Sequence, residues 1–357
     1  MATTRTISTL AGAAVALILL GPAPAHGDPR PAAGPTMQHR HYQHEIDDQR
    51  LLRQAERSQP QVTRPKAPAH RAVAPHGSGY GWPVKPFHVQ HPVRGFFGDP
   101  RVGEAADGHV ESKTFHFGVD VSAPDGTAVY ATTSGRVVWE PERPETISVR
   151  QDDGTVFAYW HIEPAVRNGQ NAIAYKTVLG HISQGWGHVH FAELVSGRHV
   201  NPLRPGGMQP YEDATRPVVK SLRAERREAG VKLNRLSGTV ELVAEAFDET
   251  PLAVPAPWAN RPVTPAALRW RVRGRAWQAA ADFRRGLPAA DEYDRVYARW
   301  TRQNKPWRNG RYRFYLTRGW DTSSVPDGEH RIDVAATDTR GNTTVRSFLV
   351  RVRNVSS

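Results

Sequence analysis

The chain has 357 residues, enough for one or two folded domains and additional tails. Lys and Arg outnumber Asp and Glu by 47 to 35, and the formal net charge of +12 favours polyanionic surroundings, such as nucleic acid or an anionic cell wall. The sequence contains no cysteine, which excludes disulfide bonds and thiolate metal sites. Any metal site must therefore use His, Asp or Glu.

The first 25 residues have the features of a secretory signal peptide. Arg5 supplies positive charge, residues 10–20 form an apolar core, and residues 23–25 (Ala-Pro-Ala) fit a cleavage site. The alternative is a membrane anchor, but an apolar stretch of about 11 residues is shorter than the roughly 20 needed to span a bilayer. We therefore predict export to the periplasm, cell envelope or exterior, with no membrane span and no nucleic-acid partner.

Residues 26–78 are expected to form a disordered spacer. They are rich in Pro, His, Gln and Arg, and they contain too few large apolar residues to offset the entropy lost on ordering. Within them, residues 42–57 have the pattern of one short helix. An inhibitory pro-segment that covers an active site is the alternative to a passive spacer, and the composition favours the spacer.

Residues 79–207 have the pattern of a β-rich domain. Short apolar runs are broken by Gly, Pro and Asp, and no long amphipathic helix is present. Two strands are predicted within residues 127–139, and single strands at 155–161 and 188–194. The fold class is therefore mainly β.

Residues 218–353 carry a second β pattern. Alternating or β-favouring runs occur at residues 239–247, 268–273, 312–316 and 347–353. Asp327-Gly328 and Gly341-Asn342 are predicted hairpin turns. Residues 327–342 resemble the closing hairpin of immunoglobulin-like modules in exported bacterial proteins, which implies an immunoglobulin-like β-sandwich.

Two short spacings are candidates for a metal site. His116 and Asp120 lie four residues apart, and His188 and His190 lie two apart on a predicted strand, so that the last two side chains face the same side. Imidazoles and one carboxylate are suitable ligands for Zn²⁺. Both spacings also occur within residues 39–48 of the predicted spacer, so spacing alone is not evidence.

The residues around His116–Asp120 and His188–His190 distinguish these two spacings from the chance repeats in the spacer. In order, the chain carries Phe-Phe-Gly-Asp-Pro-Arg at 96–101, His-Phe-Gly-Val-Asp at 116–120, a Pro-Asp-Gly-Thr run within 121–131, Gly-Arg-Val-Val at 135–138, Tyr-Trp-His at 159–161, Val-Leu-Gly at 178–180, His-Val-His-Phe at 188–191 and Asn-Pro at 201–202. This succession resembles the LytM/lysostaphin-type zinc endopeptidases, which have a duplicated hybrid motif fold. The resemblance covers residues 80–205, roughly a third of the chain.

The resemblance implies an antiparallel sheet that lines a groove and a role for five residues. His116, Asp120 and His190 match the residues that bind one zinc ion, while His161 and His188 match the catalytic pair. Zinc with three protein ligands keeps an open position for water and lowers the pKa of that water to about 7. His188 is then suited to act as general base and His161 to hydrogen-bond the oxyanion. Taken singly, each residue also fits an ordinary structural role.

Three features depart from the family pattern. Ala192 occupies the position of a usual glutamate, with Glu193 one place later. The loop at residues 183–187 is short, which leaves the substrate preference open. Trp160 replaces a small residue, and it either narrows the groove or faces the other side of the sheet.

These observations predict an exported zinc metalloendopeptidase that hydrolyses peptidoglycan stem peptides or cross-bridges. The basic C-terminal region is a candidate for binding anionic wall polymers. Two alternatives stay open: a non-catalytic peptidoglycan-binding or regulatory module, and a secreted protease that acts on protein substrates.

Overall fold

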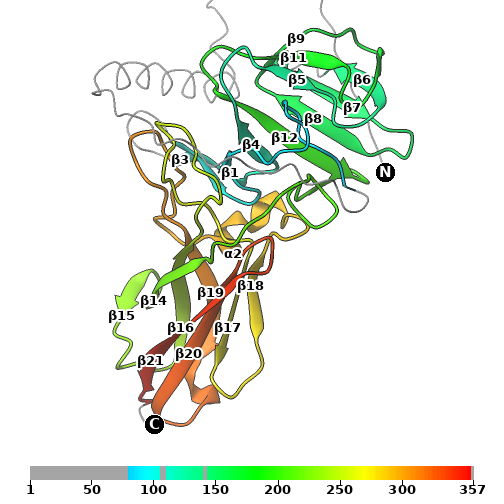
Figure 1. Ribbon diagram of the computed structural model, residues 1–357. Helices are drawn as coiled ribbons and strands as arrows, with labels where there is room; N and C mark the ends of the chain where they lie inside the picture. Colours follow the sequence, from blue (N-terminus) through cyan, green and yellow to red (C-terminus); the bar gives the residue numbers. More distant parts are fainter. Residues whose placement is uncertain (1–78, 105–109, 140–142, 355–357) are drawn as a thin grey trace, which may run out of the picture.

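The computed structural model describes residues 79–104, 110–139 and 143–354 (Figure 1). The predicted signal peptide at residues 1–25, the spacer at 26–78 and the short helix at 42–57 lie outside the described residues. In the described part of the chain, no helix is both long enough and apolar enough to cross a membrane.

The N-terminal region is built on a large antiparallel sheet with the strand order β1-β4-β12-β8-β7-β6-β10, and β13 pairs with β12 (Figure 1). Its strands are β1 (Val93–Gly95), β4 (Val119–Ser122), β6 (Gly135–Trp139), β7 (Thr146–Arg150), β8 (Val156–Trp160), β10 (Asn171–Ala172), β12 (His188–Val195) and β13 (Arg198–Val200). Two smaller sheets accompany it. They contain β5 (Ala128–Tyr130), β11 (Val178–Ile182) and β9 (Ile162–Pro164), and the pair β2 (Pro100–Glu104) and β3 (Val110–Phe115).

The strands predicted within residues 79–207 are confirmed. Residues 127–139 form β5 and β6, residues 155–161 contain β8, and residues 188–194 lie in β12. Along β12 the side chains alternate between the two faces of the sheet. Val189 and Phe191 belong to the hydrophobic core, where the Phe191 ring contacts Tyr159 edge-on at 5.3 Å. His188 and His190 therefore lie on the opposite face.

The C-terminal region consists of two four-stranded antiparallel sheets, β15-β14-β16-β19 and β18-β17-β20-β21. Their strands are β14 (Val218–Arg226), β15 (Ala229–Val231), β16 (Thr239–Phe247), β17 (Ala267–Val272), β18 (Gln278–Asp282), β19 (Arg313–Asp321), β20 (Gly328–Thr337) and β21 (Thr343–Val352), and the short helices are η1 (Ala290–Glu292), α2 (Tyr293–Val296) and η2 (Thr322–Ser324). Trp270 of β17 contacts Trp320 of β19, with 6.4 Å between the ring centroids. This arrangement is compatible with the predicted immunoglobulin-like sandwich.

One of the two predicted hairpin turns is wrong. Asp327-Gly328 does not join paired strands, because β19 and β20 belong to different sheets and η2 lies between them. The chain crosses from one sheet to the other at this point. Gly341-Asn342 does close a hairpin, between β20 and β21. The alternation predicted at residues 268–273 is also observed, since the apolar members of β17 are buried and Arg269 is exposed.

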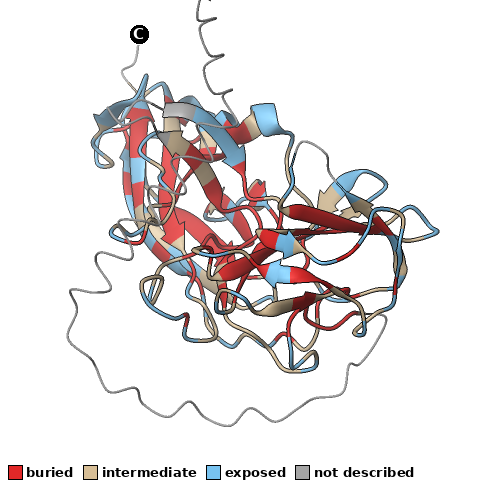
Figure 2. Ribbon diagram, turned by 90° about the horizontal axis from the view of Figure 1, so that it is seen from above, coloured by how far each residue is buried: buried red, intermediate tan, exposed pale blue. Residues whose placement is uncertain are grey.

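Buried side chains continue from the N-terminal sheets into the C-terminal sheets. Phe115, at the end of β3, contacts the rings of Phe283, Tyr293 and Tyr297 at 5.4 to 5.8 Å between centroids. Helix α2, which contains Tyr293, lies between the two regions (Figure 1). Buried residues line the strands of both regions (Figure 2). The domain limits 79–207 and 218–353 stay predictions, and the core runs through their junction.

Two buried carboxyl groups of the C-terminal sheets have opposite pKa shifts. Burial and the nearby carboxylates of Asp213 and Asp338 raise the pKa of Asp248 to about 8, although the Glu249 N–H opposes the shift. Burial alone would raise the pKa of Asp333 too, but hydrogen bonds from Arg273, Ser347 and Arg271 lower it to about 2. The folded protein thus holds a proton on Asp248 where the unfolded chain has released it.

We expect Asp248→Asn to increase stability, relative to wild type, progressively as the pH rises from about 4 to about 8, because wild type must take up a proton on Asp248 when it folds in this pH range and the variant does not. Asp333→Asn should do the opposite. It removes stabilisation that wild type retains above pH 4 and loses as the pH falls towards about 2. Urea unfolding of both variants in chelator, between pH 4 and 9, tests this. A change of the same sign in both variants at pH 8 would contradict it.

Candidate metal centre

Antiparallel pairing of β4 and β12 places Asp120 directly opposite His190, with both side chains on the face away from the core. His116 lies between β3 and β4 and reaches the same point. The His116 Nε2 and His190 Nδ1 atoms are 2.8 Å apart, and each lies 3.1 Å from Asp120 Oδ1. The three predicted metal ligands thus converge through one donor atom each.

The protonation states of this cluster suit a divalent cation. His116 Nδ1 lies 2.9 Å from the Phe96 carbonyl oxygen and donates to it, which leaves the Nε2 lone pair facing the cluster. Burial, with the nearby Arg101 guanidinium, lowers the pKa of His116 to about 4. Burial would raise the pKa of Asp120, but His116, His188 and Arg101 hold it well below its usual range. A neutral imidazole thus faces an ionised carboxylate.

The donor set fits zinc. Two imidazole nitrogens and one carboxylate oxygen converge on one point, which is the ligand chemistry of a zinc site that keeps an open position. His116 Nε2, His190 Nδ1 and Asp120 Oδ1 are the atoms that would hold the ion.

The ring of His190 is positioned by packing. Among the described residues, its buried Nε2 atom has no hydrogen-bond partner. Phe117 contacts the ring edge-on at 4.7 Å and Trp160 does so at 5.5 Å, measured between centroids. Gly118 leaves the necessary space, because a Cβ atom there would lie 2.7 Å from His190 Nε2 and 2.4 Å from the Phe191 carbonyl oxygen.

The two predicted catalytic histidines lie beside the ligands. His188 Nδ1 donates to the Trp186 carbonyl oxygen at 2.8 Å, and its Nε2 lies 3.5 Å from Asp120 Oδ1. The ring centroids of His161 and His188 are 4.8 Å apart. Burial, followed by the positive charge of Arg94, lowers the pKa of His188 well below its usual value. His188 is therefore neutral, with an Nε2 lone pair that can accept a proton.

His161 is held in an unusual backbone conformation. It follows β8 with a backbone φ of 65°, a value that residues other than glycine seldom adopt. Its ring stacks on the indole of Trp186, with 3.6 Å between centroids and 16° between planes. Burial, followed by the neighbouring His188 and His190, lowers the pKa of His161 well below its usual value. Such local strain is common at functional sites.

Sequence reasoning missed the role of the short loop at residues 183–187. The Asp125 carboxylate accepts hydrogen bonds from Gln184 Nε2 and from the N–H groups of Gly185 and Gly187, at 2.7 to 2.9 Å. These hydrogen bonds fix the loop and therefore the position of Trp186. The ring of Trp186 stacks on His161, and its carbonyl oxygen orients His188. The only sequence signal was the departure of this loop from the family length.

The other two departures from the family pattern concern Trp160 and the Ala192-Glu193 pair. Trp160 lies on the face that carries His190, and the Arg143 guanidinium lies 4.7 Å from its ring, so this residue borders the site. Glu193 points to the opposite face, where it accepts from Tyr80 and forms a bidentate pair with Arg204. It therefore does not substitute for the glutamate that Ala192 replaces. A cavity of about 520 Å³ lies beside Glu193, and none of the five predicted site residues lines it.

We expect Gly118→Ala to lower zinc affinity by at least about tenfold, because the added methyl group would displace the His190 ring. Gly230→Ala is the matched control, since a Cβ atom at Gly230 has open space. Competition with a chromophoric chelator measures both affinities. Equal affinities of the two variants would show that Gly118 does not set the position of His190.

Comparisons with known proteins identify the same region. The sequence profile described as Peptidase family M23 matches residues 114–202. The proteins named DD-carboxypeptidase/endopeptidase Mpg from Neisseria meningitidis serogroup B and Neisseria gonorrhoeae are each 25% identical over 138 residues, which cover 37% of this chain and 31% of each relative. The match thus spans less than a third of the length of these curated relatives.

Solved structures with similar folds include a zinc-containing peptidase from Vibrio cholerae, at 24% identity and a TM-score of 0.27, covering 34% of this chain and 37% of that one. LytU is similar at 19% identity and a TM-score of 0.24, covering 33% of this chain and 86% of that one. Residues 114–202 of this chain therefore match peptidase family M23.

Proposed function

We propose that this protein is an exported zinc metalloendopeptidase that hydrolyses peptide bonds in peptidoglycan stem peptides or cross-bridges. The observation that carries the proposal is the convergence of His116, Asp120 and His190 on one point, with His161 and His188 alongside. The family match and the endopeptidase relatives support the choice of reaction. The signal-peptide pattern of residues 1–25 supports export.

Each site residue has a distinct task in the proposed reaction. When bound, zinc supplies a Lewis acid that polarises the scissile carbonyl and activates water. His188 Nε2 accepts the proton of the attacking water, since its Nδ1 hydrogen is committed to the Trp186 carbonyl. His161, stacked on Trp186, donates a hydrogen bond to the developing oxyanion.

The residues around the site suit an anionic peptide. Phe117 and Trp160 form an aromatic wall beside His190, with 5.1 Å between their ring centroids. The Arg94 guanidinium lies 4.4 Å from the ring of Trp258, in the loop after β16, and its charge acts on His188. The positive charges of Arg94 and Arg143 beside these rings favour substrates that carry carboxylates.

We expect His188→Ala to lower the rate of peptide release from purified peptidoglycan by at least about 100-fold while zinc stays bound, because the variant loses a general base and no ligand. The control is His181→Ala, which alters an exposed histidine of the neighbouring β11 strand. Mass spectrometry of the released peptides identifies the bond. A chelator should abolish release in wild type, and added zinc should restore it.

Other results would select the alternatives. A wild-type protein that binds zinc but releases nothing from several wall types would indicate a non-catalytic binding or regulatory module. Cleavage of protein substrates with no action on purified walls would indicate a secreted protease of different specificity.

We also propose that the basic C-terminal sheets bind anionic wall polymers. Part of the positive charge is neutralised internally, because Arg271 and Arg273 share Asp333. Arg269 is exposed on β17, and its guanidinium lies 5.4 Å from the Trp277 ring. We expect binding of the whole protein to isolated walls to weaken steadily between 0.05 and roughly 0.5 M salt, since exposed charges are screened. Binding that does not change with salt would contradict this.

A further inference from the structure

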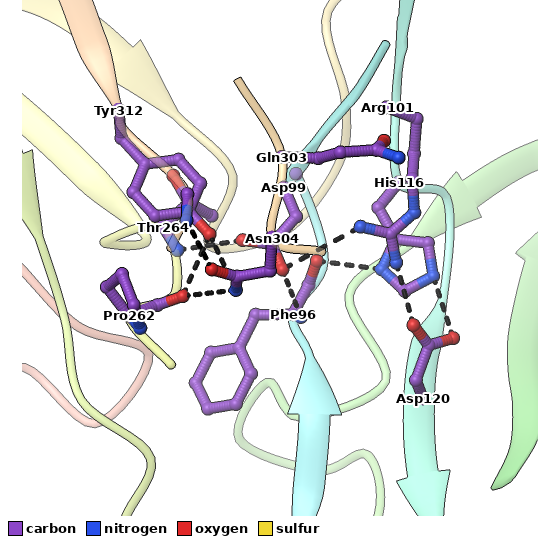
Figure 3. A network of polar contacts seen from close by, with 12 residues as sticks. Phe96, Asp99, Arg101, His116, Asp120, Pro262, Thr264, Gln303, Asn304 and Tyr312 are labelled. Atoms are coloured by element: carbon purple, nitrogen blue, oxygen red, sulfur yellow. Dashed lines mark hydrogen bonds and ion pairs between the residues drawn. The ribbon is translucent and has the colours of Figure 1, made fainter. Parts of the chain in front are cut away.

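Asp99 is one of the residues through which the segment around the metal ligands contacts the C-terminal region (Figure 3). Its side chain is only 2% exposed. Oδ1 accepts a hydrogen bond from the N–H of Thr264, 165 residues away, and Oδ2 accepts one from the N–H of Phe96, both at 2.8 Å. One carboxylate thus connects the loop before β17 to the loop between β1 and β2.

From Asp99, two short paths lead to the metal ligands (Figure 3). The N–H of Phe96 donates to Asp99, and the carbonyl oxygen of Phe96 accepts a hydrogen bond from His116 Nδ1 at 2.9 Å. Arg101 Nη1 lies 3.9 Å from Asp99 Oδ2, and Arg101 Nη2 donates to Asp120 Oδ2 at 2.7 Å. The oxygen of Asp120 that faces the histidines is the other one, Oδ1.

The backbone beside Asp99 is held from the C-terminal side as well. The hydroxyl of Tyr297 donates to the Gly98 carbonyl oxygen at 2.7 Å and lies 3.1 Å from Thr264 Oγ1. Gly98 packs so closely on Phe283 that a Cβ atom would lie 2.6 Å from that ring. Gly98 and Asp99 in turn exchange backbone hydrogen bonds of 2.8 Å with His116.

The C-terminal anchor is itself fixed in the sandwich. Val263, directly before Thr264, exchanges two backbone hydrogen bonds with Asp248, at the end of β16. Residue 264 thus has a defined position relative to the C-terminal sheets, and the Thr264 N–H can serve as a rigid donor. Hydrogen bonds to the groups around metal ligands fix ligand orientation and tune metal affinity.

We propose that the C-terminal region supports the zinc centre. Asp99 is the positioning residue, because it links the packing of the C-terminal region to the orientation of His116 and Asp120. This inference rests on the proposed zinc site but not on any substrate. It extends the role of the C-terminal sheets from attachment to the wall to support of the metal ligands.

The test compares full-length variants that preserve shape. Asp99→Asn leaves only one acceptor oxygen for two N–H donors and removes the charge beside Arg101. Tyr297→Phe keeps the ring but loses the bond to Gly98. We expect zinc affinity, measured by competition with a chromophoric chelator, to fall about 10- to 100-fold in Asp99→Asn and by a smaller factor in Tyr297→Phe. The visible spectrum of the Co²⁺-loaded variants should shift as the ligand geometry loosens.

Asp333→Asn is the matched control, because it alters another buried, arginine-paired aspartate within the C-terminal sheets. It should lower stability at neutral pH and leave zinc affinity and the cobalt spectrum unchanged. If Asp99→Asn and Tyr297→Phe bind zinc within about twofold of wild type, the positioning role is wrong and Asp99 is structural only. A wild-type chain that binds no zinc would contradict the proposed function and this inference together.

Discussion

The antiparallel pairing of β4 with β12 is the constraint on which the rest of the site depends. It sets Asp120 opposite His190 on one face, while Val119, Val121, Val189 and Phe191 fill the core on the other. A slip of one residue would exchange the two faces and bury the imidazoles among apolar side chains. The hydrophobic core thus enforces the register, and the register places two of the three ligand atoms within 3.1 Å of each other.

Burial then sets the chemical state of the ligands. His116, His188 and Asp120 are all nearly inaccessible to water, so a charged imidazole is disfavoured, whereas Asp120 stays ionised among its cationic and polar neighbours. Two of the rings have one nitrogen committed to a backbone carbonyl, His116 to Phe96 and His188 to Trp186. Loops outside the sheet therefore decide which nitrogen faces the site, and their geometry is as much a part of the centre as the strands.

This dependence on loops gives the C-terminal sheets their importance. The segment from Phe96 to Asp99 is hydrogen-bonded to His116 on one side. On the other side it is hydrogen-bonded to Thr264 and Tyr297 and packs against Phe283. The aromatic cluster around Phe115 extends the same contact to the residue directly before His116. The hydrophobic core is continuous across the junction of the two regions. Because close-packed interiors are hard to deform, a shift of one region is transmitted to the other.

The sequence by itself determined the mainly β fold and several of its strands, because side-chain alternation is a property of neighbours along the chain. It also predicted the five site residues, from motifs whose order along the chain can be read without a structure. Tertiary structure decided that Trp160 faces the site, that Trp186 supports His161 and His188, and that Asp99 meets Thr264. It also overturned the hairpin at Asp327-Gly328, since a local turn signal cannot say which sheet the next strand joins. Contacts between residues 165 positions apart arise from packing, which no local pattern encodes.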